Sequence, residues 1–273
     1  MMWFRDSLEV ARQSLMLQLS RRMILLGVIA VTVFGVLIGL MSWRAAPAAA
    51  GDDFLGSMIY FLLFQFVLPL VAVYMGVSAV NADIEDGTFT YLFVRPVRRT
   101  SLLFGKWLSA ALLGWLWATL VIAVIWLAVA GPSRPWYEGR SPSPGVAIAF
   151  IGAAALATPA YAAVGAFFGA FFRRPLVFTM LFVVGWEVII SNTPPQAWLR
   201  GATVADPVRR WLMENLPQAG ELREALGWSA LDFLDDPAKL GDPIWSVVRF
   251  TLILLCLAVW VYTRREYDSR PRD

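Results

Sequence analysis

Residues 107–133 read WLSAALLGWLWATLVIAVIWLAVAGPS, and no charged side chain interrupts them. A helix needs about 20 apolar residues to cross the roughly 30 Å hydrocarbon core of a bilayer, so this stretch predicts a transmembrane helix. The chain contains further apolar windows of similar character on both sides of it. They cover residues 23–43, 54–82, 141–172, 175–192 and 243–263. The sequence therefore predicts an all-α polytopic membrane protein, with six transmembrane helices in a single transmembrane domain.

The composition agrees with a membrane protein and excludes several classes of site. Of 273 residues, 59% are hydrophobic and 16% are charged, whereas soluble domains have about 45–50% apolar and about 25% charged residues. The chain has no histidine and a single cysteine, Cys256, so the commonest ligands of zinc, haem and iron–sulfur centres are missing. We therefore expect no metal site, no catalytic residue and no bound cofactor in this chain.

The basic residues predict the orientation, because Lys and Arg near span ends favour the cytoplasmic side. They gather before the first span, between the second and third spans, between the fourth and fifth, and after the sixth. The opposite short loops hold only Arg44, Arg134 and Arg140. Both termini are therefore predicted to be cytoplasmic. The net charge of +3 then marks span ends and lipid contacts rather than nucleic-acid binding.

Two segments outside the spans carry helix signals. In residues 1–22 apolar positions recur at steps of three and four, which predicts an amphipathic helix in the cytoplasmic membrane interface; packing on a soluble partner is the alternative. Its apolar positions are Phe4, Leu8, Ala11, Leu15 and Leu19. Residues 193–242 are net acidic and are predicted to form short helices on or in the outer leaflet, with Asp206 capping a helix that Pro207 opens. A small folded outer cap is the alternative for this segment.

The loop between the second and third spans, residues 81–106, has the most informative local sequence. Residues 83–99 read DIEDGTFTYLFVRPVRR. Gly87 permits the chain reversal that ends the second helix, Thr88 can cap a short helix, and Pro96 stops it. The sequence therefore predicts a short cytoplasmic helix inside this loop.

That short helix has an unusual surface for a segment facing the cytosol. Phe89, Leu92 and Phe93 lie on one side of it, between an acidic and a basic cluster. Such an apolar knob is what docking into a groove of a soluble partner requires. Alternatively, the loop is an interfacial turn whose Arg98 and Arg99 contact lipid phosphates.

This loop resembles the signature of the type 2 ABC transporter permeases, in which paired acidic residues precede Gly-Thr, and a leucine, a proline, an arginine and a Gly-Lys pair follow. The matching positions are Asp83 and Glu85, Gly87-Thr88, Leu92, Pro96, Arg99 and Gly105-Lys106. Asp83 stands where a glutamate is more usual. The interfacial first helix, six spans and outer helices before the last span also agree with that family. The resemblance implies the membrane-spanning subunit of a bacterial ABC exporter in the cytoplasmic membrane.

The resemblance also implies partners. Residues 88–94 would act as a coupling helix seated in a separate ATP-binding subunit, and two permease copies, identical or similar, would associate with two such subunits. The residues expected at that contact are Asp83, Glu85, Asp86, Gly87, Thr88, Phe89, Leu92, Phe93, Arg95, Pro96, Arg98 and Arg99. ATP and Mg²⁺ would bind the partner, because Gly105-Lys106 lacks the upstream glycine and the following Ser or Thr of a P-loop.

Two ionisable residues fall within predicted spans, Glu187 in the fifth and Arg249 in the sixth. Charges there are costly unless they are paired or face a cavity. Both lie roughly 8 to 9 Å below the outer surface at 1.5 Å rise per residue. We therefore predict an intramembrane ion pair between them that clamps the last two spans. A gate or proton-sensitive step, and unpaired snorkelling of Arg249, are the alternatives.

Other features of the sequence bear on helix packing, on the substrate and on alternative functions. Gly165 and Gly169 have the small-xxx-small spacing of closely packed helices, for which packing within the chain is favoured over a dimer face. The aromatic and small residues of the spans suit an apolar or amphiphilic substrate. A non-transporting membrane scaffold is the alternative function. An intramembrane enzyme lacks the paired groups that acid–base or nucleophilic catalysis requires.

Overall fold

The computed structural model describes residues 2–20, 55–56, 59–85, 99–130, 143–172, 174–190, 203–216 and 241–264. These residues form helices and short connections, with no strand among them. The helices are α1 (Met2–Ser20), η1 (Ile59–Val67), α4 (Leu68–Glu85), α6 (Arg99–Ala130), α7 (Pro144–Phe171), α8 (Pro175–Leu181), η2 (Phe182–Ile190), α10 (Ala205–Asn215) and α12 (Pro243–Arg264). An all-α architecture is expected in a bilayer, because a helix satisfies its own backbone polar groups.

Four described helices are long and apolar enough to cross a membrane: Ile59–Asn81, Arg99–Leu127, Pro144–Phe171 and Pro243–Arg264. They correspond to the second, third, fourth and sixth predicted spans. The third begins at Arg99, within the segment predicted as loop. The predicted fifth span, 175–192, is the continuous pair α8 and η2, of which Pro175–Glu187 is a shorter apolar helix. The predicted first span, 23–43, lies outside the described residues, so the count of six remains a prediction.

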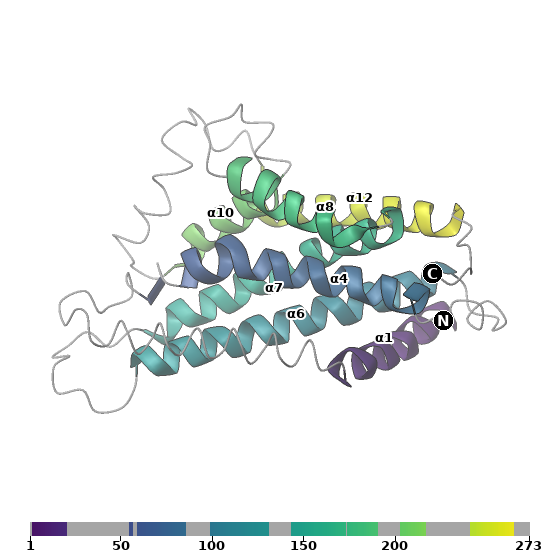
Figure 1. Ribbon diagram of the computed structural model, residues 1–273. Coiled ribbons are helices and arrows are strands. Elements are labelled where there is room, and N and C mark those ends of the chain that lie inside the picture. The colour runs from purple at the N-terminus through teal and green to yellow at the C-terminus, as the bar shows by residue number, and fades with distance from the viewer. Residues whose placement is uncertain are drawn as a thin grey trace, which may run out of the picture.

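Helix α7 is the centre of the bundle. It packs against α4, α6 and α12, and Figure 1 shows these helices running side by side around it. The buried faces of α7 carry small side chains, and Ala153, Ala157 and Ala160 are fully buried. Small residues let helix backbones approach closely. In a bilayer the lipid tails are as apolar as the side chains, so this close van der Waals packing is a main source of the energy that holds helices together.

The closest approach joins α4 to α7 at two glycines. A Cβ built on Gly76 would meet the Ala162 carbonyl oxygen and lie 3.0 Å from the Gly165 Cα, and a Cβ on Gly165 would meet the Val73 carbonyl oxygen. One turn further along, a Cβ on Gly169 would lie 3.2 Å from the Val77 carbonyl oxygen. The predicted packing of Gly165 and Gly169 within the chain is thereby confirmed.

Helix α1 lies against the first part of α6. Ser7 and Ser101 share a 2.9 Å hydrogen bond, and the Ser109 hydroxyl donates to that of Ser14 at 2.9 Å. The predicted apolar stripe is only partly buried: Ala11 is buried and Leu15 packs against the core, whereas Leu8 is 46% exposed. The serine pairs lie at the same contact and satisfy their own polar atoms there.

The two ends of the bundle differ, and we name them after α1 and α10. At the α1 end, Val80, Leu103, Ala170 and Tyr262 gather in a second buried cluster that joins α4, α6, α7 and α12. At the α10 end, α10 packs on α7 and α12. Figure 1 shows α1 and the last turn of α12 at one end of the long helices and α10 toward the other.

The contact between α4 and α7 yields a stability prediction. Gly165→Ala should destabilise the protein by roughly 1–3 kcal/mol, because the added methyl meets backbone atoms that cannot rotate away. Gly114→Ala is the matched control, since its Cβ would meet only ordinary contacts at 3.6 Å or more. Thermal unfolding in detergent should show a lower midpoint for the first variant and an unchanged or higher midpoint for the second. Equal midpoints would contradict the packing assigned to Gly165.

Candidate functional sites at the two ends of the bundle

The predicted coupling region begins and ends at the α1 end. Asp83 and Glu85 belong to the last turn of α4, and Arg99 is the first residue of α6. The remaining predicted contact residues lie outside the described residues. They are Asp86, Gly87, Thr88, Phe89, Leu92, Phe93, Arg95, Pro96 and Arg98. The predicted coupling loop therefore leaves the bundle at the end of α4 and returns to it at the start of α6.

Described members of the motif have structural roles at this end. The exposed Arg99 guanidinium donates to the Thr263 carbonyl oxygen at 3.1 Å, and so binds the last turn of α12. A cation is favourable there because the carboxyl end of a helix carries partial negative charge. Gly105 lies directly beneath α1, where a Cβ would be 2.6 Å from the Ser7 carbonyl oxygen. Lys106 is buried beside it. The Gly of the Gly-Lys pair thus permits α1 to pack on α6.

A second candidate site lies at the α10 end, around Glu187. This side chain is 2% exposed. Its two carboxylate oxygens accept hydrogen bonds from the backbone N–H groups of Val204 and Ala205, both at 3.0 Å, and from the Tyr161 hydroxyl at 3.3 Å. The amide donors are among the first of α10, which have no partner inside their own helix. Glu187 therefore caps the amino end of α10 from a different element.

A cluster of charged groups continues from this contact into α10. Asp206 lies 3.3 Å from Arg209 and 3.2 Å from Arg210, and all three side chains are buried. Arg210 also donates to the Gly241 carbonyl oxygen at 2.9 Å. Gly241 has φ of 70°, a left-handed conformation that glycine adopts without strain. The Arg210 hydrogen bond attaches α10 to the turn before α12, and Asp206 pairs with the same guanidinium group.

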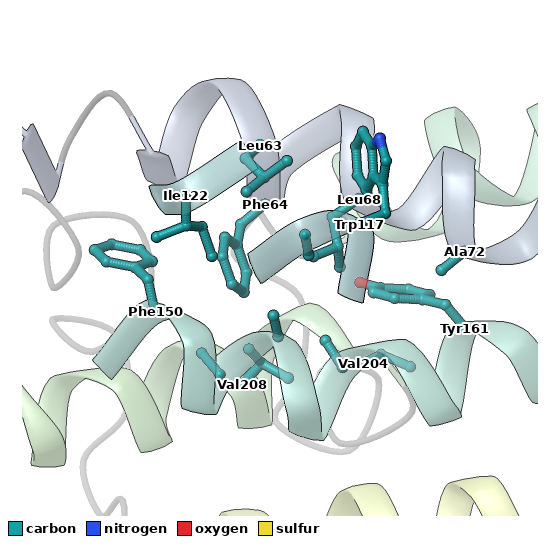
Figure 2. Packing of buried hydrophobic residues seen from close by; sticks show 14 of the residues in the cluster. Leu63, Phe64, Leu68, Ala72, Trp117, Ile122, Phe150, Tyr161, Val204 and Val208 are labelled. Atoms are coloured by element: carbon teal, nitrogen blue, oxygen red, sulfur yellow. The ribbon is translucent and has the colours of Figure 1, made fainter. Parts of the chain in front are cut away.

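A small cavity lies between these groups. It has a volume of about 20 Å³. Its polar lining residues are Tyr60, Gln65, Tyr161 and Glu187, and its apolar ones are Phe64, Ala157, Ala205 and Val208. A polar cavity of this size has room for about one water molecule. Figure 2 shows the adjoining core, in which Phe64, Phe150, Tyr161 and Val208 gather. A water molecule in this cavity would lie beside the Glu187 carboxylate.

The predicted ion pair between Glu187 and Arg249 is not formed between these two described residues. Arg249 is exposed on α12, whereas Glu187 is bound by two amides and a phenol. The amides and the positive end of the α10 dipole stabilise the carboxylate, so no arginine is needed. An exposed Arg249 matches the snorkelling alternative, in which the long side chain reaches polar surroundings.

The sequence contained a signal for the true start of α10. Thr203-Val204-Ala205-Asp206 has the capping-box spacing, and the Thr203 hydroxyl accepts from the Asp206 N–H at 3.4 Å. The predicted cap at Asp206 is therefore wrong, because the helix begins at Ala205 and the Asp206 carboxylate pairs with arginines instead. No three His, Cys, Asp or Glu side chains in the described ranges are grouped closely enough to hold a metal ion.

Comparison with protein families identifies the class of protein. Residues 8–196 match the family described as ABC-2 family transporter protein. The chain belongs to this family. The resemblance drawn from the coupling-loop motif is confirmed, and this ABC-2 family member is a multi-pass membrane protein. Comparison with curated proteins finds no match. The family match includes Glu187 and ends before α10 and α12.

The charged cluster of α10 yields a second prediction. Asp206→Asn should destabilise the protein by about 3–5 kcal/mol, because it leaves two buried guanidinium groups without their carboxylate. Glu214→Gln is the control, since it removes the same charge from an exposed position on the same helix. Thermal unfolding in detergent measures both. If the two variants unfold at the same temperature, the cluster contributes nothing to holding α10.

Proposed function

We propose that this ABC-2 family protein is the permease subunit of an ATP-driven transporter, coupled through residues 81–106 to a separate ATP-binding subunit. The observation that carries the proposal is the family match over residues 8–196, which includes the whole coupling motif. Two permease copies and two ATP-binding subunits would form the complex. ATP and Mg²⁺ would bind to the partner, and this chain would perform no catalysis.

The distribution of charge supports the α1 end as the cytoplasmic one. Arg12, Arg99, Arg174 and Arg264 are all exposed and belong to the helix ends or the α1 helix at that end. Exposed arginines near span ends favour the cytoplasmic side of a membrane. In this orientation the coupling loop leaves α4 and returns to α6 where a soluble ATPase could reach it, in the bacterial cytoplasmic membrane.

The outer surface of the helices is compatible with an apolar or amphiphilic substrate, and the family resemblance implies export as the direction. Helix α12 exposes Trp245, Leu252, Ile253 and Trp260, and α8 exposes Leu181. These surfaces suit lipid tails, a second permease copy or a cargo that arrives through the membrane. Within the described spans, the buried charged residue away from the α1 end is Glu187, and its carboxylate is bound to the amides of α10 rather than facing a path for ions.

The proposal predicts a physical complex that depends on the coupling loop. The tagged protein, purified from its native membrane, should bring with it a P-loop ATPase that mass spectrometry identifies. The double variant Gly87→Pro, Leu92→Asp should lose most of that partner, because it breaks the predicted short helix and places a charge in its apolar face.

The control is Glu214→Gln, an exposed change at the α10 end, which should retain the ATPase. Thermal unfolding must show that the double variant is folded. Recovery of no ATPase with the folded wild type would favour the scaffold function. Equal recovery with wild type and double variant would place the contact elsewhere on the chain.

A further inference from the structure

We propose that Glu187 is a proton-binding site that latches α10: as a carboxylate it holds α10 in the end of the bundle, and protonation releases it. The inference goes beyond the proposed transport function and does not depend on it. It concerns an element, α10, that lies outside the matched family segment. It rests on the hydrogen bonds, the burial and the cavity at the α10 end.

The first step is that Glu187 accepts from the amides of Val204 and Ala205 at the start of α10, while Thr203 accepts from the next amide, that of Asp206. The helix begins at Ala205, and its own N-cap residue, Val204, provides no side-chain hydrogen bond. The N–H groups of Val204 and Ala205 both donate to the Glu187 carboxylate. Buried N–H groups that lose their acceptor are costly. The occupancy of this contact therefore determines how firmly the amino end of α10 is held.

The second step is that the hydrogen-bond partners of the Glu187 carboxylate are neutral. They are two amides and the Tyr161 phenol of α7. The other titratable or charged groups facing it are Tyr60 of η1 and Asp206 and Arg209 of α10, and Arg209 is paired with Asp206. A charge held by neutral donors is removed by a single proton without breaking a salt bridge.

The third step is what that proton does. A carboxylate only accepts hydrogen bonds, whereas a protonated carboxyl has one O–H donor. In the carboxylate form both oxygens of Glu187 accept these bonds with a full negative charge. A bound proton removes that charge and so weakens the hydrogen bonds from Val204, Ala205 and Tyr161, because bonds to an ionised acceptor are about twice as strong as neutral ones. The adjoining cavity of about 20 Å³ has room for one water molecule that could pass a proton to the carboxylate.

The fourth step is that α10 covers surface that its release would expose. Val208 and Leu212 are buried in the main core with Phe64 and Phe150. Trp211 lies over Gly152 of α7, where a Cβ would be 2.6 Å from its ring. Movement of α10 would uncover Val208, which also lines the cavity. Its accessibility is therefore a direct measure of the latch.

The experiment measures that accessibility in the full-length protein. In a Cys256→Ser background, Val208→Cys is the reporter and Glu214→Cys, at an exposed position of the same helix, is the reference. Each is labelled with a membrane-impermeant thiol reagent in detergent. The ratio of the two rates cancels the direct effect of pH on thiol reactivity, because both reporters experience it.

The latch predicts a pH-dependent ratio that Glu187 alone controls. Between about pH 8 and about pH 5 the ratio should rise roughly tenfold with Glu187 present, as the released population grows. With Glu187→Gln, which imitates the protonated form, it should be high at both pH values. Tyr161→Phe, which keeps the carboxylate, should retain the pH dependence with a higher ratio throughout.

Two results would overturn the latch. A ratio that stays constant with pH in the protein with Glu187 would overturn the latch, even if Glu187→Gln fails to fold. A pH dependence that persists in folded Glu187→Gln would also overturn it, because another group would then be the proton acceptor.

Discussion

The contact between Gly76 and Gly165 is the constraint on which the rest of the structure depends. Because neither residue has a side chain, the α4 and α7 backbones touch, with the Cα of Gly165 only 3.0 Å from where a Gly76 Cβ would lie. That contact fixes α7 as the central helix, against which α6 and α12 also pack. The same helix carries Tyr161 toward Glu187 and Gly152 beneath Trp211. A shift of α7 would therefore disturb the core and the α10 end together.

The two ends of the bundle use different chemistry for the same task of attaching a helix. At the α1 end, serine pairs and a glycine bring α1 onto α6, and the charged residue Lys106 is buried beside them. At the α10 end, a buried carboxylate and a buried Asp206 with two arginines hold α10. Serine and glycine contacts are insensitive to pH and tolerate lipid surroundings. A buried carboxylate is stable only while its hydrogen bonds persist, so the attachment of α10 depends on the bonds to Glu187.

The sequence predicted what depends on local composition and missed what depends on long-range contact. Apolar length was enough to find α4, α6, α7 and α12, and the loop motif was enough to find the family. The sequence marks Glu187 as unusual, because burial of a charge is costly wherever it occurs. The sequence does not reveal its partners, because two of them are backbone amides whose position depends on how α10 packs against the bundle. Leu8 shows the same limit, since the face that α1 buries includes Ala11 and the serine contacts but leaves Leu8 46% exposed.

Contacts through α7 link the α1 end of the bundle to the α10 end. Trp107, which follows the Gly-Lys pair on α6, donates its indole N–H to the Pro159 carbonyl oxygen at 2.9 Å. Pro159 has no backbone N–H to donate, so α7 lacks one of its internal hydrogen bonds there. Tyr161 lies two residues further along and donates to Glu187, which in turn holds α10. A displacement of α6 against α7 at Trp107 would thus act on a turn of α7 that lacks one hydrogen bond, close to Tyr161, which donates to the Glu187 carboxylate.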